Sequence, residues 1–598
     1  MTTAPQRIED YGFVGDTHTG CLVSREGSID WYCTPRFDSA ACFARLLGDD
    51  SNGFWSLQPR GDFRCSRRYL PGTLVLETTF ETPSGTAQVI DFMPIRGNEP
   101  DLVRIVRTTK GRVELETRIS PRFDYGRSVP WARATRGGVE WIAGPDALLV
   151  ASDAALAVRE ADAVAELTLA EGDARSFVLG WFPSHDVAAA PVDAAASLDS
   201  TRRWWLDWTA RGDASFEDDA VTRSLITLKA LTYAPTGGIV AAATTSLPEE
   251  IGGVRNWDYR FCWVRDATFT LYALMLAGYT EEAVRWRDWL LRATAGAPEQ
   301  MQIMYGAAGE RRLPEMELPW LRGFAGSAPV RVGNAASAQF QLDVYGELMD
   351  ALHQTRRAGI HPSADAWRLQ HELVTFLEGA WRKPDEGIWE VRGPRRHFTH
   401  SKVMAWVAFD RAVKAVERLG LDGPRDRWAG IRDEIHREVC DKGYNPAVGA
   451  FTQFYGSDLL DASLLMVPLV GFLPASDPRV VSTARAVRER LCVEGFVRRY
   501  SAEATEDVDG VPGDEATFIP CTLWLADNLA MMGERAQAQR LYEQVTGIAN
   551  DLGLLSEEYD PVEGRLLGNF PQAFSHVGVV NTARNLALSE GPATRRRG

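Results

Sequence analysis

Apolar and polar positions alternate in two different ways along this chain, and the change falls near residue 200. Before it, short apolar runs are separated by Gly, Pro and Asp turns. After a Lys-Gly turn at 110–111, every second residue from Val113 to Ile119 is apolar or threonine, and the residues between them are glutamate or arginine. This alternation has the period of a half-buried strand. Similar runs occur at 73–80, 138–143, 155–168 and 175–182. We therefore predict an N-terminal antiparallel β-sandwich over residues 1–199.

From residue 219 onward the apolar spacing becomes helical, and we expect a catalytic domain over 219–598. Between the two regions, residues 200–218 carry three tryptophans and predict a linker helix that packs against both. The predicted helices are 219–232, 266–278, 280–293, 335–357, 363–382, 401–419, 424–440, 459–470, 479–491, 515–533, 535–551 and 572–588. Twelve helices in successive pairs give six hairpins, as an (α/α)6 barrel requires.

Composition and charge narrow the class of protein. The 598 residues carry a formal net charge of −16, which excludes a phosphate-backbone ligand because nucleic-acid binding needs a basic face. The first residues lack a signal peptide's apolar run, and no stretch of about 18 apolar residues predicts a membrane span. The eight cysteines are scattered along the chain without a Cys-x-x-Cys pair, and we expect them to be reduced thiols. We expect a cytoplasmic protein with no nucleic-acid or membrane partner, and self-association into a homo-oligomer stays open.

Histidine spacing gives little sign of a metal site. His397 and His400 stand close together, but no acidic or thiolate cluster accompanies them. Structural or substrate-contacting roles are the better interpretation of both residues. We expect no metal and no cofactor.

Two glutamates in the C-terminal half carry candidate chemistry. Glu390 ends Asp-Glu-Gly-Ile-Trp-Glu (385–390), and Glu557 lies in Gly-Leu-Leu-Ser-Glu-Glu-Tyr-Asp-Pro (553–561). Hydrolysis of a glycosidic bond usually takes two carboxyl groups, one that donates a proton and one that activates water. Taken alone, each glutamate is more simply interpreted as a solvated charge on the surface. The prediction depends on their joint occurrence with a third segment.

That third segment is Asn-Trp-Asp-Tyr-Arg-Phe-Cys-Trp-Val-Arg-Asp (256–266). It offers tryptophan and tyrosine faces for a sugar ring, and an arginine–aspartate pair for sugar hydroxyls. The alternative interpretation is a set of core aromatics and an ion pair at a helix start. All three segments fall in predicted loops at helix ends, where a barrel can gather distant residues into one pocket.

Together these residues resemble glycoside hydrolase family 15, the glucoamylase, glucodextranase and trehalase family, over nearly the whole chain. Residues 256–266 resemble the segment that lines its glucose subsite, 387–390 the loop of its general acid, and 556–559 the loop of its general base. Residues 498–500 resemble the segment that offers an arginine to the substrate, and 15–31 the start of the family's β-sandwich. The resemblance implies a β-sandwich followed by an (α/α)6 barrel, and hydrolysis with inversion.

The resemblance also implies residue roles. Glu390 protonates the glycosidic oxygen beside the apolar wall of Trp389, and Glu557 stays ionised and activates a water on the opposite face of the ring. Inversion places the two carboxyls about 6.5–9.5 Å apart. The implied substrate contacts are Tyr259, Trp263, Arg265, Asp266, Trp389, Arg499 and Glu558.

Departures from the family pattern bear on the substrate, which is a small disaccharide or oligosaccharide. Val391 and Phe518 replace a glutamate and a tryptophan of fungal relatives on the side of the leaving sugar, which disfavours a starch chain. The insertion 313–326 is expected to wall off the pocket beyond the second sugar. We expect exo-acting release of glucose from α,α-trehalose. The alternative is a glucoamylase- or glucodextranase-type α-glucosidase acting on maltose, isomaltose or short α-glucans.

Two rivals come from other classes of protein. A disaccharide phosphorylase also inverts on an α/α barrel, but it replaces the base with a phosphate site, and the base-like context of Glu557 argues against it. A non-catalytic sugar-binding protein would keep the aromatic residues without needing both glutamates. Release of glucose from any disaccharide eliminates the second rival.

Overall fold

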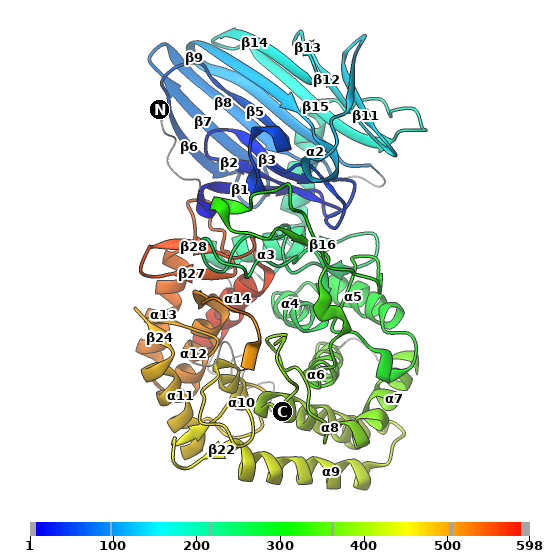
Figure 1. The fold of residues 1–598 in the computed structure, drawn as a ribbon, viewed down its shortest axis with the longest axis vertical. Helices are drawn as coiled ribbons and strands as arrows, with labels where there is room; N and C mark the ends of the chain where they lie inside the picture. The colour runs from blue at the N-terminus through cyan, green and yellow to red at the C-terminus, as the bar shows by residue number, and fades with distance from the viewer. Residues whose placement is uncertain (1–6, 96–98, 214–217, 360–363, 502–507, 588–598) are drawn as a thin grey trace.

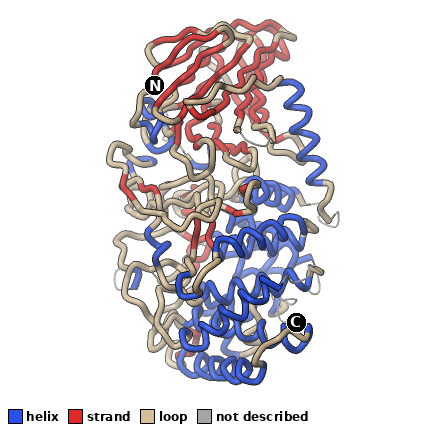
Figure 2. Tube along the Cα trace, turned by 90° about the vertical axis from the view of Figure 1, so that its right-hand side faces the viewer, coloured by secondary structure: helices blue, strands red, loops and turns tan. Residues whose placement is uncertain are grey.

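The computed structural model describes residues 7–95, 99–213, 218–359, 364–501 and 508–587. Strands fill one end of the molecule and helices the other (Figure 1). Loops and short strands lie between them in the side view (Figure 2). This architecture confirms the predicted order of an antiparallel β-sandwich followed by a helical barrel.

Two antiparallel sheets form the N-terminal domain and share the long strand β9 (Asp101–Ser120). The first sheet also contains β1 (Tyr11–Gly15), β2 (Gly20–Ser24), β3 (Ser28–Cys33), β4 (Ala41–Phe43), β5 (Phe54–Pro59), β13 (Ala157–Arg159) and β14 (Asp162–Ala170). The second contains β6 (Arg64–Tyr69), β7 (Leu76–Thr82), β8 (Gly85–Phe92), β10 (Trp131–Thr135), β11 (Gly138–Ala143), β12 (Asp146–Ser152) and β15 (Ala174–Pro183). Fully buried tryptophans of both sheets, Trp55 and Trp141 among them, fill the core.

The predicted turn at residues 110–111 is wrong, because β9 continues through it. Gly111 has a φ of +69°, which bends the strand without reversing it. Before the bend β9 pairs with β8 and β15, and after it with β5 and β14. The bend therefore passes one strand from the second sheet to the first.

Six helices with almost continuous burial form the inner ring of the barrel: α4 (Val264–Leu276), α6 (Asp343–Arg357), α8 (Thr399–Leu419), α10 (Met466–Leu469), α12 (Ile519–Met531) and α14 (Ala573–Ala587). The outer helices bury mainly one face: α3 (Asp219–Ala230), α5 (Thr280–Ala293), α7 (Ala364–Ala380), α9 (Arg425–Glu438), α11 (Pro478–Arg490) and α13 (Arg535–Gly547). All twelve predicted helices of the (α/α)6 barrel have a counterpart in these two rings.

Three helices begin at least four residues later than predicted, each for a local reason. The helix predicted from 335 begins at Asp343, because residues 335–338 form a separate 3-10 turn. The one predicted from 515 begins at Ile519, because β26 (Thr517–Phe518) pairs instead with β27 (Glu558–Asp560). The helix predicted over 459–470 is reduced to a 3-10 turn followed by α10.

The tryptophan-rich helix α2 (Ala194–Thr209) begins before the predicted residue 200. It contacts both domains, because the Thr209 hydroxyl donates to the carbonyl of Gly72 and the Trp208 indole donates to Glu282 at 2.8 Å. Residues 214–217 of the predicted linker lie outside the described residues. Within the described ranges, no helix has both the length and the apolar character needed to cross a bilayer.

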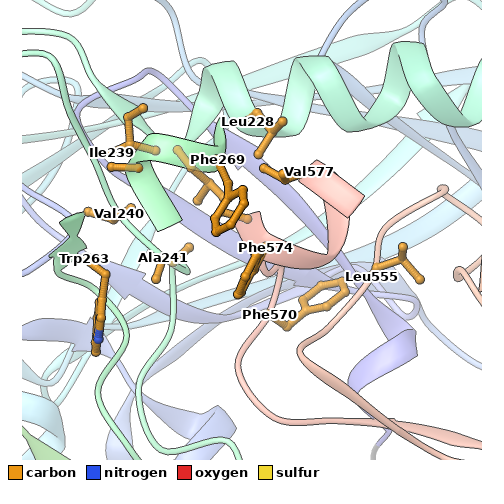
Figure 3. Close-up of a cluster of buried hydrophobic side chains, with 14 of the residues drawn as sticks. Leu228, Ile239, Val240, Ala241, Trp263, Phe269, Leu555, Phe570, Phe574 and Val577 are labelled. Atoms are coloured by element: carbon orange, nitrogen blue, oxygen red, sulfur yellow. The ribbon is translucent and has the colours of Figure 1, made fainter. Parts of the chain in front are cut away.

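An apolar cluster joins separate parts of the barrel (Figure 3). Trp263 directly precedes α4 and Phe269 lies within it, Leu555 and Phe570 come from the segment between α13 and α14, and Phe574 comes from α14 itself. The rings of Phe269 and Phe574 stack with centroids 5.3 Å apart. Burial of each large side chain contributes about 1.5–3 kcal/mol, so the cluster fixes the start of α4 against the loop before α14.

Candidate active site

Glu390 lies between α7 and α8 in a left-handed backbone conformation, with a φ of 55°. A residue other than glycine costs about 1–2 kcal/mol there, and such strain gathers at functional sites. The side-chain amide of Gln339 holds the turn by donating to the carbonyls of Glu390 and Val391, both at 3.1 Å. One carboxylate oxygen of Glu390 accepts hydrogen bonds from the Trp263 indole at 3.2 Å and from Arg265 Nη1 at 3.1 Å.

Burial is the main cause that raises the pKa of the Glu390 carboxyl to about 7. The carboxylates of Asp266 and Asp343 raise this pKa further, and Arg265 opposes the shift. A carboxyl with a pKa near neutrality can donate a proton at physiological pH. The environment therefore suits the proton donor that the resemblance implies at this position.

Arg265 and Asp266 open α4 and form a buried ion pair, with Arg265 Nη2 2.9 Å from Asp266 Oδ2. Arg265 also donates to the carbonyl of Ile388 and reaches Glu390, so it joins the start of α4 to the Glu390 loop. Arg265, held by Asp266, thus stabilises the loop.

Trp389 supports the same loop from the other side. Its indole donates to Asp461 Oδ1 at 2.9 Å, and its ring meets that of Phe518 with centroids 5.4 Å apart. The guanidinium of Arg499 lies over both rings, at 5.7 Å from Trp389 and 5.3 Å from Phe518. The aromatic wall expected from Trp389 thus includes Phe518, the residue where fungal relatives have tryptophan.

Glu557 lies between α13 and α14, and backbone hydrogen bonds fix it on both sides. Its N–H donates to the carbonyl of Asn569 and its own carbonyl accepts from the N–H of Ile519, both at 3.2 Å. Gly568 packs so closely that a Cβ there would lie 2.8 Å from Glu557 Oε2, and its φ is +72°. Only glycine fits this close approach.

Burial, followed by the carboxylate of Glu249, raises the pKa of Glu557 to about 8. Arg499 and a hydrogen bond from Tyr259 oppose the shift. The resemblance implied an ionised Glu557, but its surroundings in this structure favour the protonated form at neutral pH. Arg499 and Tyr259 are therefore the groups that support its ionised form.

Tyr259 stands edge-on to Trp263, with ring centroids 5.1 Å apart. The next residue, Arg260, is fully buried, and its side chain reaches from the barrel to the sandwich. It donates to the carbonyl of Ser39 at 2.8 Å and to the hydroxyl of Tyr125 at 2.9 Å. The N-terminal domain thus helps to fix the segment that carries Tyr259.

Arg499 sits among three buried glutamates. Its Nη2 lies 2.7 Å from Glu515, 2.9 Å from Glu249 and 3.3 Å from Glu558. In the described parts of the chain, these three acids form the group whose carboxylate oxygens lie within 4.8 Å of one another, and Arg499 supplies the positive charge among them. Glu558 also accepts from the N–H of Ala516, so its carboxylate holds Arg499 and the backbone in place.

One pocket collects part of the predicted site. Its lining includes Tyr259, Trp263, Trp389, Glu390 and Arg499. The remaining four predicted residues are buried outside this lining: Arg265, Asp266, Glu557 and Glu558. Glu557 stays connected to the pocket through its hydrogen bond with Tyr259.

The insertion 313–326 does not line the pocket as expected, because its residues 320–323 contact the sandwich and its residues 316–317 pair with 331–332. The Trp320 indole donates to the carbonyl of Tyr125 at 3.0 Å, and the N–H of Gly323 donates to the carbonyl of Leu47 at 2.9 Å. Its link to the pocket is Glu315, which forms a two-bond ion pair with Arg392.

The residues of this lining that were missed from the sequence include Glu249, Arg255, Asn334, Ala336, Arg392, Tyr500, Asp509 and Val511. Arg392 follows the predicted acid by two positions and Tyr500 follows Arg499, so proximity to the motifs was a usable signal. Glu249 follows Leu-Pro shortly before the segment 256–266, but nothing in its spacing marks it as buried.

Comparison with known proteins adds to this geometry. The model of the family described as "Glycosyl hydrolases family 15" matches residues 215–584, and that described as "Trehalase-like, N-terminal" matches residues 1–174. The chain is 40% identical to "Trehalase" of Mycolicibacterium smegmatis over 98% of this chain and 92% of the relative. It is 38% identical to "Trehalase" of Mycobacterium tuberculosis, over 98% and 90%. A solved bacterial glucoamylase in complex with acarbose has a TM-score of 0.74 and 12% identity, over 100% of this chain and 96% of that one.

Proposed function

The chain belongs to glycosyl hydrolase family 15, as the resemblance predicted, and on that premise we propose that it hydrolyses α,α-trehalose to glucose with inversion. It is a glycoside hydrolase, and its substrate is a sugar. The choice of trehalose is supported by relatives named trehalase that match almost the whole chain, the N-terminal domain included.

The observation that carries the mechanism is the pair of buried carboxyls on two separate loops beside one aromatic pocket. Glu390 protonates the glycosidic oxygen, because burial keeps its proton available near neutral pH. Glu557 in its ionised form takes a proton from the attacking water. Tyr259 and Arg499 stabilise that ionised form, since both lower the pKa of Glu557.

Inversion follows from a base that acts through water. The water attacks the anomeric carbon from the face opposite the leaving sugar, and no covalent bond to the enzyme forms. The α-linked substrate therefore yields β-glucose from the attacked unit.

The test of this function is glucose release from trehalose, maltose, isomaltose and soluble starch, measured side by side. We expect kcat/KM for trehalose to exceed that for maltose by at least about a hundredfold, because a site built for one pattern of hydroxyls leaves buried partners unpaired with another. Faster cleavage of maltose or starch would contradict trehalose as the substrate and leave the inverting glucosidase standing. No glucose from any of the four would overturn the glycosidase itself.

A cytoplasmic location and self-association stay predictions. Fractionation of cells and light scattering of the purified chain test them. Neither result bears on the chemistry of the pocket.

A further inference from the structure

One wall of the pocket is a short backbone segment that follows the predicted motif 498–500 along the chain. Residues 508–511 form this segment, called the strap here, and its Asp509 and Val511 line the pocket. Val508, Asp509 and Val511 are buried, at 3%, 4% and 9% exposure. A loop segment with so little exposure must have its polar groups paired.

The strap is fixed on one side by the residues that follow the acid loop. The N–H of Arg392 donates to the carbonyl of Asp509 at 2.7 Å. Gly393 packs so tightly beneath it that a Cβ would lie 2.2 Å from the carbonyl oxygen of Val508. The close approach of these two backbones requires glycine at 393.

Two side chains fix the strap on its other side. Arg255 Nη2 lies 2.5 Å from Asp509 Oδ2 and donates to the carbonyl of Val511 at 3.0 Å. The hydroxyl of Tyr500 donates to the same carboxylate oxygen of Asp509 at 2.9 Å. Both side chains also line the pocket, so the strap and its anchors form one continuous surface.

The position of the strap identifies which part of the substrate it faces. Glu390 protonates the oxygen that departs with the leaving sugar, and Arg392, two residues further on, holds the strap. Arg392 is in turn fixed by Glu315 and lies 4.3 Å from the ring of Trp257, another residue of the lining. The strap therefore closes the pocket on the side of the leaving sugar.

We propose that residues 508–511 are a specificity-determining wall that ends the pocket after the leaving glucose and so restricts the enzyme to disaccharides. The proposal rests on the proposed glycosidase function. It assigns to the strap the role that the sequence suggested for the insertion 313–326. Longer leaving groups are rejected because the strap is anchored from both sides and cannot make room for a third sugar.

The test compares each disaccharide with the same sugar extended by one glucose on the leaving side. The probes are trehalose and α-maltosyl α-glucoside, with maltose and maltotriose as a second pair. In the wild-type chain we expect kcat/KM for the trisaccharide to be at least about tenfold lower than for its disaccharide, in the range that a poorly fitting group costs.

Gly393→Ala displaces the strap by sterics alone, since the new Cβ must move from 2.2 Å to at least 3.0 Å from Val508. We expect the trisaccharide-to-disaccharide ratio of kcat/KM to rise at least about tenfold. Gly379→Ala is the matched control: Gly379 lies on α7, nothing lies within 4 Å of its Cβ position, and the ratio should not change. If Gly393→Ala does not fold, Tyr500→Phe loosens the strap by removing the hydroxyl that holds Asp509.

Each result bears on one conclusion. A rise of the ratio in either strap variant, with Gly379→Ala unchanged, supports the wall. A ratio within twofold of wild type in every strap variant that folds overturns it, and so does a wild type that cleaves both lengths equally. A wild type that releases no glucose from any disaccharide overturns the proposed function instead.

Discussion

Replacement of Arg499 by glutamine tests the electrostatics of the site, with Arg498→Gln as the neighbouring control. Arg499 is 7% exposed in its side chain and contacts three glutamates that are 0–3% exposed. Removal of one partner from a buried ion pair costs about 3–5 kcal/mol. Arg498 pairs with Asp514 at 3.2 Å, but these side chains are 26% and 45% exposed, so its loss should cost about 0–1 kcal/mol.

The cost of Arg499→Gln should also depend on pH. Burial already raises the pKa of Glu249 and that of Glu558 in the folded chain, and without Arg499 both rise further. Carboxyls that bind protons more tightly when folded destabilise the fold as pH rises above their unfolded values of about 4.3. The variant should therefore be closer to wild type at pH 5 than at pH 8.

Urea unfolding followed by helix ellipticity, for both variants at both pH values, gives the stability difference. The pH profile of kcat/KM gives a second measurement that a purely structural role would not change. Since Arg499 lowers the pKa of Glu390 as well as that of Glu557, its loss should move both limbs of the profile to higher pH. Equal stability of the two variants, within about 1 kcal/mol, together with an unmoved profile would refute the reasoning.

Four further predictions concern the reaction. Glu390→Gln and Glu557→Gln should each lower kcat by at least about three orders of magnitude. A variant that keeps a tenth of wild-type turnover would contradict the catalytic role assigned to that glutamate. Proton NMR of the first product should show β-glucose from the attacked unit; initial α-glucose would contradict the mechanism. The pH profile should be highest between about 7 and 8, because the base must lose a proton with a pKa of about 8 and the acid must keep one with a pKa of about 7. Tyr259→Phe should move the basic limb to higher pH and lower the maximal rate, because loss of the hydrogen bond raises the pKa of Glu557, which already lies above that of Glu390; an unshifted basic limb would argue against that bond.

Periodicity predicted the barrel well because its helices bury long, regular faces. Inner helices such as α8 are apolar over many turns, and this signal is local to the sequence. The bend in β9 could not be predicted in this way. A Lys-Gly pair at 110–111 indicates a turn equally well in a hairpin and in a bent strand, and only the partners on each side decide between them.

The candidate site was predictable where its residues share a motif, and not where they meet across the fold. The aromatic segment and the two glutamate loops were visible in the sequence. The cluster around Arg499 joins Glu249, Glu515 and Glu558, which are up to about 310 positions apart, and no local pattern marks a carboxylate as buried. The strap was missed for the same reason, since its role depends on Gly393 and Arg255, each more than a hundred residues away.

Arg260 also has a consequence for protein engineering. Its guanidinium is buried at the boundary of the two domains, and its partners Ser39 and Tyr125 belong to the sandwich. A barrel fused to a foreign sandwich would keep the bonds from Arg260 to Asp258 but lose these two acceptors, one residue away from Tyr259. Chimeric enzymes assembled from family members should therefore retain activity only when both halves of this boundary come from the same parent.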